Sequence, residues 1–406
     1  MAEKEIAVSN KHVKLRVALT ISFFVIAVVA FAIGISSIGK KDPGEYEINA
    51  VANDDLPAYG SEFKGVFDFS GDEVGATYKQ LEATFSESLQ RSYCLFDETE
   101  FHTSVLSMSA LNSHPNEEVE ISEDACSVLF DALAKTHENK NYSIYAAPIY
   151  AYWDWLFSLD SDLQKVNDPK NHAENKELLE GIVKYCKEPY VKLELNGNNK
   201  AKLTVSEEYL NFREENNITA PIVSLNVLKN AYRLQMVADL FIEKGYTFGY
   251  IYHTDGYYIS LKDHRDPIYS LYDINGNSFV KYAVVQIGKP SCAVMTKRFT
   301  VGNPDYNPYY VLDDGTIRNN VINISTGYGD QYYASTSLFG KSNNVVEIAY
   351  QSNYLSTLSL TEATNFLNEK YCSFTLSEND KKAYTTSRLV EYITINTDKG
   401  YNLSQL

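Results

Sequence analysis

The sequence of Ile222–Lys262, IVSLNVLKNAYRLQMVADLFIEKGYTFGYIYHTDGYYISLK, predicts a helix followed by a β-hairpin. Apolar residues recur at steps of three and four along its first half, which places them on one face of a helix. These residues are Val227, Ala231, Leu234, Ala238 and Phe241. Lys244 and Gly245 are typical of a helix end, because a cation suits the negative pole and glycine tolerates a positive φ. Tyr246–Tyr252 has strand composition, and Asp255-Gly256 is a strong hairpin-turn signal.

Turn dipeptides recur in the rest of the chain. Asn196-Gly197, Asn275-Gly276 and Asp314-Gly315 each separate two segments of strand-like composition. Helical periodicity marks Thr77–Phe96, and Ser122 is a suitable N-cap for a helix that continues to about His137. Strands and helices do not alternate regularly, so we predict an α+β fold with mainly antiparallel sheets.

Four further segments complete the secondary-structure prediction. We expect a charged loop at Asp160–Asn175 and a helix at Lys176–Tyr185. Val345–Ser352 is rich in β-branched and apolar residues, which favours a strand, and Tyr354–Lys370 should form the helix after it. Arg388–Asn396 is expected to be the last strand.

The N-terminal part of the chain contains a segment long enough to cross a bilayer. Val17–Ile38 is uncharged and almost wholly apolar, and it is longer than the apolar core of a cleaved signal peptide. More basic residues precede the segment than follow it, which favours a cytoplasmic N-terminus. We therefore expect a cytoplasmic tail over residues 1–16, a transmembrane signal anchor over 17–38, a linker over 39–64 and an extracytoplasmic domain over 65–406.

The composition indicates a globular, acidic protein. The 406 residues are 44% hydrophobic and 22% charged, and the formal net charge is −17. Because the segment up to residue 41 is net basic, the rest of the chain is more acidic still. Such a surface repels nucleic acid and anionic lipid head groups, so neither is expected as a partner. The 32 tyrosines suit strand surfaces, and they could also stack on sugars or aromatic rings.

Several common functional motifs are missing from the sequence. It contains no G-x-G-x-x-G, P-loop, HExxH or G-x-S-x-G motif. The five cysteines are widely spaced without a CxxC pair, so they do not form a zinc site, and we expect them to be buried. Asp273-Ile-Asn275-Gly-Asn277 lacks the distal acid of a calcium loop, which favours a simple β-turn.

Short motifs follow one another in a suggestive order between about residues 77 and 370. Ser104-Val-Leu-Ser107-Met-Ser-Ala-Leu111-Asn112 comes first, then Val119-Glu-Ile121-Ser122 and Pro148-Ile-Tyr-Ala-Tyr-Trp153. After the opening stretch come three more segments: Cys292–Arg298, Tyr310–Asp313 and Gln331–Phe339. This order and spacing resemble the FAD:protein FMN transferase (ApbE-like) family. The resemblance implies a T-fold-like α+β domain and Mg²⁺-dependent transfer of FMN from FAD to a Thr or Ser of a partner protein, outside the membrane.

The resemblance also assigns roles to particular residues of this chain. It implies flavin contacts from Tyr142, Ser143, Tyr232, Asp255, Gly256 and Arg298. It places Thr336 near the metal, and Tyr310 and Asp313 at positions that are catalytic in the family. Asp330 lies two residues before the position of the metal Asp and could replace it only if the local turn shifts.

The chain departs from the family pattern at several charged positions. Ser224, Asn226 and Asn230 stand where the family has Asp, Gly and Lys, and Tyr332 stands where it has the metal-binding Asp. Because Mg²⁺ prefers charged oxygen ligands, these changes weaken the metal site.

Two interpretations of the function follow. In the first, the protein is an active flavin transferase whose Asp255, Asp313 and Asp330 rebuild the Mg²⁺ site, while Tyr142, Tyr232 and Tyr310 border the flavin. In the second, it is a catalytically silent relative that keeps a tyrosine-lined cleft and acts as a surface binding or scaffold protein. The second predicts weak or absent Mg²⁺-dependent FAD binding. In both, each of these residues could instead serve packing or a turn.

Overall fold

The architecture is that of a large sheet covered by helices, described by a computed structural model. The structure describes residues 42–51, 62–69, 74–102, 106–138, 140–262, 266–275, 278–288, 291–297, 308–329, 333–376 and 380–406. The expected tail and membrane anchor, residues 1–38, lie outside these ranges. Among the helices within them, none is both long and apolar enough to cross a membrane.

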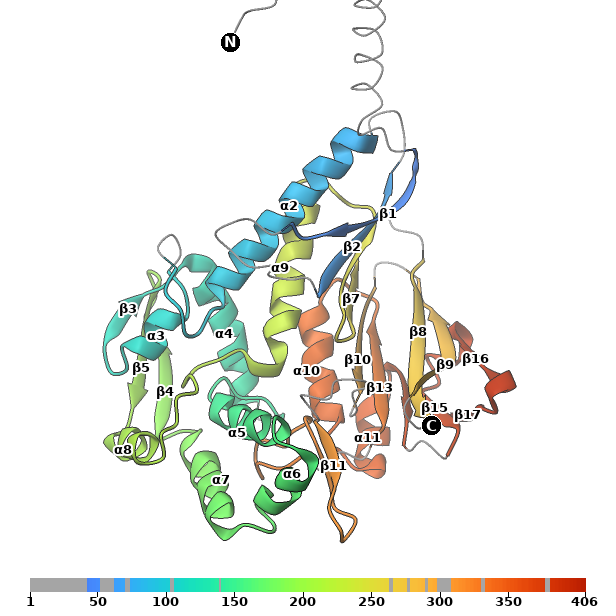
Figure 1. Ribbon diagram of the computed structural model, residues 1–406. Helices are drawn as coiled ribbons and strands as arrows, with labels where there is room; N and C mark the ends of the chain where they lie inside the picture. The colour runs from blue at the N-terminus through green and yellow to red at the C-terminus, as the bar shows by residue number, and fades with distance from the viewer. Residues whose placement is uncertain are drawn as a thin grey trace, which may run out of the picture.

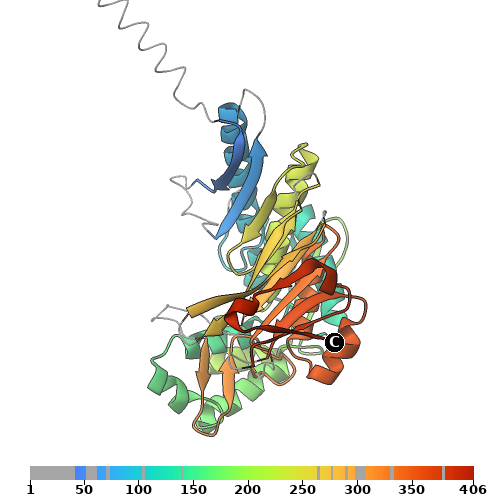
Figure 2. The same cartoon turned by 90° about the vertical axis from the view of Figure 1, so that its right-hand side faces the viewer.

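The central sheet has nine strands in the order β1-β2-β6-β7-β10-β13-β14-β15-β17. All neighbouring pairs are antiparallel except β15 and β17. Figure 2 shows the strands running from the blue N-terminal pair to the red C-terminal strands. The bounds are β1 Gly44–Asn49, β2 Phe63–Phe69, β6 Tyr250–His253, β7 Tyr257–Ser260, β10 Cys292–Lys297, β13 Ser335–Gly340, β14 Tyr371–Thr375, β15 Lys382–Thr385 and β17 Asn402–Gln405.

Three helices cover one face of this sheet (Figure 1): α2 (Val74–Leu95), α9 (Lys229–Glu243) and α10 (Val345–Leu355). A short helix, α11 (Leu360–Leu367), follows α10. The other face packs against a small antiparallel sheet of β8 (Ile268–Asn275), β9 (Ser278–Gln286) and β16 (Ile393–Ile395). The interface between the two sheets forms its own apolar core, which includes Tyr269, Tyr282, Met295 and Phe339.

The remaining elements form a lobe beside the helical layer (Figure 1). It contains a three-stranded sheet in the order β3-β5-β4 and a two-stranded ribbon of β11 and β12. Its bounds are α3 Ser109–Ser113, β3 Glu118–Glu120, α4 Glu123–His137, α5 Ala147–Phe157, α6 Ser161–Asn167, α7 Ala173–Tyr185, β4 Val191–Leu195, β5 Lys200–Val205, α8 Glu207–Glu215, η1 Asn226–Leu228, β11 Tyr309–Val311 and β12 Ile317–Asn319.

The stretch from Ile222 to Lys262 forms the predicted helix and hairpin, but its first strand is Tyr250–His253 instead of Tyr246–Tyr252. Helix α9 buries Ala231, Leu234, Ala238 and Phe241 against the sheet and α2. It ends at Glu243, and Gly245, two residues later, has a φ of +86°, the left-handed conformation expected after a helix. Strands β6 and β7 then pair as the predicted antiparallel hairpin.

Several other predicted elements are also confirmed. Ser122 caps α4 by accepting a hydrogen bond from the backbone N–H of Ala125. The strands on either side of the three turn dipeptides form the β4–β5, β8–β9 and β11–β12 pairs. The α+β class with mainly antiparallel sheets is therefore correct.

The prediction of a strand at Val345–Ser352 is wrong, because this segment belongs to α10. Asn344 caps the helix, accepting a hydrogen bond from the N–H of Glu347. The helix is enclosed between α9 and strands β10 and β13, so it buries apolar residues on most of its surface. A helix that is apolar on nearly all sides has little helical periodicity in its sequence. Its β-branched residues then give it the composition of a strand.

Three boundaries also differ from expectation. The expected loop at Asp160–Asn175 contains α6 and the start of α7. Part of the expected linker over residues 39–64 is strand β1, whose Ile48 is fully buried. The expected last strand, Arg388–Asn396, shortens to β16, and β17 follows it as a strand that was not predicted.

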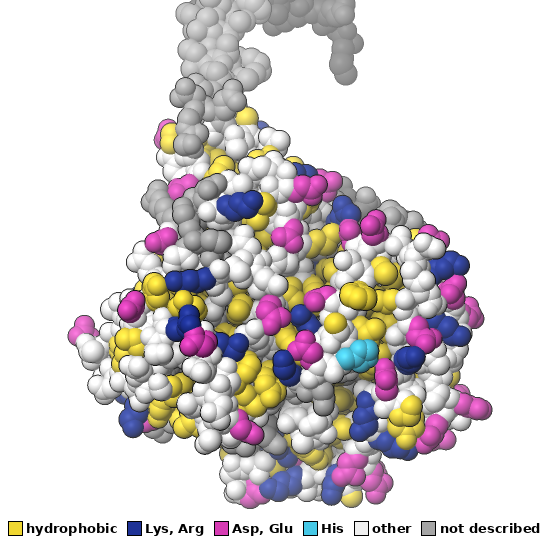
Figure 3. All heavy atoms as spheres, turned by 180° about the vertical axis from the view of Figure 1, so that it is seen from behind, with side chains coloured by type: hydrophobic (Ala, Val, Ile, Leu, Met, Phe, Trp, Pro, Cys, Tyr) yellow, Lys and Arg dark blue, Asp and Glu magenta, His cyan; other side chains and the backbone are white. Residues whose placement is uncertain are grey.

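The described cysteines are free thiols: Cys94, Cys186, Cys292 and Cys372 are buried and Cys126 is half-buried. This agrees with the expectation of buried single cysteines. On the face seen in Figure 3, Lys and Arg side chains are interspersed with Asp and Glu and do not form a continuous basic patch.

Candidate functional site

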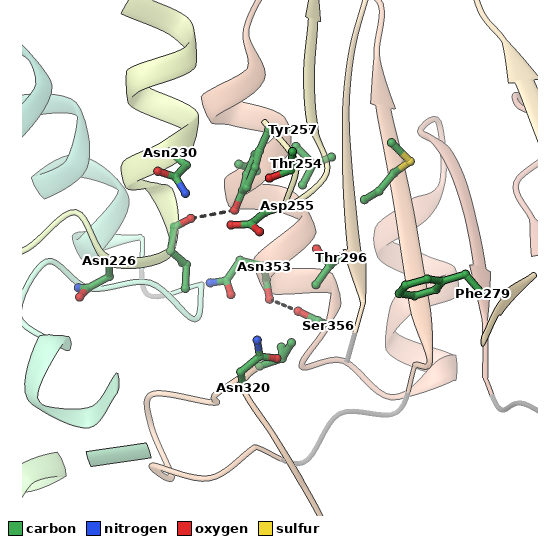
Figure 4. Close-up of a pocket in the computed structure, with 15 residues that line it drawn as sticks. Asn226, Asn230, Thr254, Asp255, Tyr257, Phe279, Thr296, Asn320, Asn353 and Ser356 are labelled. Atoms are coloured by element: carbon green, nitrogen blue, oxygen red, sulfur yellow. Dashed lines mark hydrogen bonds between the residues drawn. The ribbon is translucent and has the colours of Figure 1, made fainter. Parts of the chain in front are cut away.

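A cavity of about 530 Å³ lies where the start of α9, the β6–β7 turn, the end of β10 and the C-terminal half of α10 meet (Figure 4). Its volume is in the usual range for a small-molecule site. The described lining residues are Asn226, Val227, Asn230, Thr254, Asp255, Tyr257, Phe279, Val294, Met295, Thr296, Asn320, Val321, Ala349, Asn353 and Ser356.

Four asparagines give this cavity its chemical character. Asn226 and Asn353 are held in place: their Nδ2 atoms donate to the carbonyls of Ser143 (2.7 Å) and Asn141 (2.5 Å). In the described chain, the side-chain amides of Asn230 and Asn320 have no hydrogen-bond partner. An amide both donates and accepts, so the pair can match the mixed edge of a heterocycle.

Asp255 is the one carboxylate among the described lining residues, and none of them is a lysine or arginine. Its side chain is 68% exposed, and its Oδ2 lies 3.5 Å from Nδ1 of His253. The same Nδ1 accepts a hydrogen bond from the Asp255 N–H, which leaves the proton of the neutral ring on Nε2. Burial lowers the pKa of His253 to about 4, so this ring is neutral and gives the site no positive charge.

Gly256 shapes the turn beside Asp255. Its φ is +104°, and a Cβ at this position would lie 2.3 Å from the carbonyl oxygen of Met295. The backbone N–H of Met295 donates to the carbonyl of Gly256 at 2.9 Å. Glycine is therefore required for β10 to approach the turn closely.

A smaller cavity of about 60 Å³ adjoins the first one and shares Thr254, Met295 and Thr296 with it. Thr336 lines this smaller cavity from β13. Its side chain is completely buried, and its Oγ1 has no hydrogen-bond partner within the described chain. Such an orphaned hydroxyl is costly in a protein interior, so it is a candidate ligand-facing atom.

Tyr142 and Ser143 line a different cavity. It has a volume of about 400 Å³ and lies between α4, α5 and α7. The Tyr142 side chain is 1% exposed, and its hydroxyl donates to the carbonyl of Leu225 at 3.3 Å. Burial raises the pKa of this hydroxyl well above its ordinary value. The contact between Asn226 and the Ser143 carbonyl lies between this cavity and the first.

Tyr232 and Tyr310 are both packed and hydrogen-bonded away from the asparagine-lined cavity. The Tyr232 hydroxyl donates to Asp131 Oδ2 at 2.6 Å, and the Tyr310 hydroxyl donates to Asp168 Oδ2 at 2.7 Å. Burial, with these carboxylates, raises the pKa of both hydroxyls. Asp313 lies on the β11–β12 ribbon, where its side chain is 96% exposed and 3.2 Å from Lys165 Nζ.

The structure therefore brings together only some of the site residues that the sequence predicted. Asp255 lines the main cavity, and Gly256 and Thr336 line the adjoining one. Tyr142, Ser143, Tyr232, Tyr310 and Asp313 line neither. Arg298 and Asp330 lie outside the described residues.

Several lining residues had no signal in the sequence. Asn320 comes from the loop after β12, Asn353 from α10 and Ser356 from its C-cap, all well beyond the opening stretch in the sequence. Isolated polar residues of this kind are common in sequences, and only the tertiary structure, in which α10 packs beside α9, brings these to one cavity. Asn226 and Asn230 stand out in the sequence only through the family comparison.

Comparison with known proteins identifies the fold. No family model matches the sequence, and no curated protein shows significant similarity to it. Solved structures do match: the ApbE protein from Thermotoga maritima is 15% identical with a TM-score of 0.57, over 81% of this chain and 94% of that one.

Two further matches agree with it. The flavin transferase ApbE from Vibrio cholerae is 12% identical (TM-score 0.57, 86% of this chain and 99% of that one). The flavinyl transferase ApbE from Pseudomonas stutzeri is 10% identical (TM-score 0.56, 84% and 93%). The expected resemblance is thus confirmed at the level of structure, and the chain has the fold of the ApbE flavin transferases.

Proposed function

We propose that this protein is a flavin-nucleotide-binding relative of the FAD:protein FMN transferases that has lost Mg²⁺-dependent transfer. The observation that carries the proposal is the cavity at the start of α9, which is lined by four asparagines and one carboxylate. The fold, which resembles that of flavin transferases, supports a flavin as the ligand. The chemistry of the residues that line the cavity distinguishes flavin binding alone from Mg²⁺-dependent FMN transfer.

The described residues fit the ring system of a flavin. Asn230 and Asn320 offer unpaired amides to the polar edge of the ring, and Tyr257, Val294 and Met295 offer apolar surface. The N–H groups at the start of α9 are already paired, because Leu225 donates to Glu98 Oε1, Asn226 donates to Ser224 Oγ and Lys229 donates to the carbonyl of Asn226.

The described residues do not fit Mg²⁺. Of the three acids expected to rebuild its site, Asp313 pairs with Lys165 on the exposed ribbon, and Asp330 lies outside the described ranges. Asp255 and the neutral hydroxyl of Thr336 remain, whereas Mg²⁺ prefers an octahedron with charged oxygen ligands. Cleavage of a pyrophosphate needs its charge neutralised, and none of the described lining residues is cationic.

We place the protein at the outer surface of a membrane. This rests on the apolar segment Val17–Ile38 and on the basic residues that precede it. Carbonate extraction and protease accessibility of intact cells test it. Release of the chain by carbonate, or full protection from external protease, contradicts it.

Titration of the full chain with FMN and with FAD, followed by flavin fluorescence, tests the binding. We expect a Kd on the order of 10 µM that EDTA and added Mg²⁺ leave unchanged. Asn230→Ala and Asn320→Ala should each weaken binding, because each removes hydrogen bonds to the ring. Asn365→Ala is the matched control, since Asn365 is an exposed residue of α11 and should leave binding unaltered. Undetectable flavin binding refutes the proposal.

FMN transfer to a partner protein is the second candidate, and the orphaned Thr336 hydroxyl favours it. Co-expression with a flavin-acceptor protein, followed by in-gel fluorescence, distinguishes the two. A fluorescent acceptor that disappears with EDTA or with Thr336→Val would establish transfer and overturn the loss of activity proposed here.

A further inference from the structure

A tyrosine-lined groove lies on the opposite side of the central sheet from α9. It has a volume of about 480 Å³ and is lined by Glu45, Tyr250, Tyr252, Tyr258, Ile259, Asp266, Pro267, Ile268, Tyr269, Ser270 and Tyr272. Side chains alternate between the two faces of a strand, so Tyr257 and Tyr258 point to opposite faces. The Tyr257 hydroxyl bonds to Val227 beside α9, and Tyr258 packs with the small sheet.

The rings in this groove form a continuous aromatic row. Tyr250 and Tyr252 have centroids 6.0 Å apart, and Tyr252 stacks on Tyr258 at 5.2 Å with an interplanar angle of 10°. Tyr258 then meets Tyr269 edge-on at 5.6 Å. Tyr272 on β8 also lines the groove, and it is 39% exposed.

Carboxylates lie along the row. Glu45 lines the groove from β1, and Asp266 lines it from the segment before β8; both are exposed. Glu47 is near, because the Tyr252 hydroxyl donates to its Oε2 at 3.2 Å. Among the described residues, Lys64 is a cation near this carboxylate, and its Nζ is 3.6 Å from Glu47 and bonded to Asn49. None of the described residues lining the groove is a lysine or arginine.

We propose that this groove is a second binding site, for an elongated organic cation of the polyamine class. Tyrosine faces attract ammonium groups through their negative quadrupole, and they also provide apolar surface for the methylene chain between the ammonium groups. Glu45 and Asp266 lie at the groove as charge partners for those groups.

Charge and shape distinguish this ligand from a neutral sugar and from a flavin nucleotide. A sugar would gain from the rings but not from the carboxylates, and a nucleotide phosphate would be repelled by them. The groove shares no lining residue with the flavin cavity, whereas the smaller cavity that contains Thr336 shares Tyr258, Ser270 and Tyr272 with the groove. A titration without flavin therefore tests the groove by itself.

Isothermal titration of the full chain with spermidine, at constant ionic strength and without flavin, tests the proposal. We expect a Kd on the order of 10⁻⁵ M and no detectable binding of maltose. The double variant Glu45→Gln/Asp266→Asn should weaken spermidine binding about tenfold. Tyr272→Leu should weaken it about twofold to fivefold, whereas Tyr272→Phe keeps the aromatic face and should bind as the parent does.

A double variant elsewhere controls for the acidity of the whole chain. Glu87→Gln/Glu177→Gln also removes two exposed carboxylates, but from α2 and α7, far from the groove in sequence and outside its lining. It should retain the parent affinity. The proposal is overturned if both double variants weaken binding equally, if Tyr272→Leu binds as tightly as Tyr272→Phe, or if maltose binds and spermidine does not.

Discussion

Tyr310→Phe should destabilise the fold without affecting flavin binding, because the Tyr310 hydroxyl belongs to a buried ionic network. Asp168 is fully buried and accepts from the Tyr310 hydroxyl at 2.7 Å and from Arg318 Nε at 2.9 Å. Its Oδ1 also accepts the backbone N–H of Lys170 at 2.8 Å. The network attaches the β11–β12 ribbon to the loop between α6 and α7.

The loss of folding stability depends on which buried group each substitution leaves without a partner. Tyr310→Phe removes one hydrogen bond to a carboxylate, which costs about 1.5–3 kcal/mol. Asp168→Asn leaves the Arg318 guanidinium buried without its counter-charge, which costs about 3–5 kcal/mol. The two effects should not add, because the tyrosine loses its charged acceptor once Asp168 is replaced.

Urea unfolding followed by circular dichroism measures these changes, and the flavin titration is repeated on each variant. Tyr246→Phe is the matched control: the Tyr246 hydroxyl has no hydrogen bond within the described chain, and its ring contact with Phe241 is retained. We expect no change in the unfolding midpoint for this control. A Tyr310→Phe variant with the parent's midpoint but weaker flavin binding would refute the structural role and restore Tyr310 as a site residue.

Three further predictions concern the turn, its histidine and the orphaned hydroxyl. Burial lowers the pKa of His253 to about 4, below the 6.5 of an unfolded chain, so the unfolded state binds more protons between these values and stability should fall as pH drops from 6.5 towards 4. Urea midpoints at several pH values would show a loss of up to about 3 kcal/mol that His253→Phe abolishes; a pH-independent difference between the two proteins would contradict it. Gly256→Ala should cost more than about 2 kcal/mol and weaken flavin binding, because its Cβ would meet the Met295 carbonyl at 2.3 Å; unchanged thermal unfolding would show that the turn can relax. Thr336→Val should leave stability unchanged or raise it by about 1 kcal/mol, because it removes an unpaired buried hydroxyl, and a loss of stability would indicate an unrecognised partner.

The sequence by itself was sufficient for most elements of the fold. Periodic segments such as α9 and turn dipeptides such as Asp255-Gly256 are local signals, since spacing and backbone preference act within a few residues. Val345–Ser352 is a segment for which these local signals gave the wrong secondary structure. Its helical state depends on burial between α9 and the sheet, and the apolar residues that such burial requires have no helical pattern of their own.

The candidate site was decided mainly by the tertiary structure. Asp255 and Gly256 belong to a local turn, so the sequence could indicate them as site residues. Tyr142, Tyr232 and Tyr310 are site candidates only because of their positions in the family resemblance. In the structure their hydroxyls donate to the Leu225 carbonyl, Asp131 and Asp168, because a buried hydroxyl is costly without a partner. Asn320 and Asn353 reach the cavity from distant segments: Asn320 from the loop after β12, and Asn353 from α10, which packs beside α9.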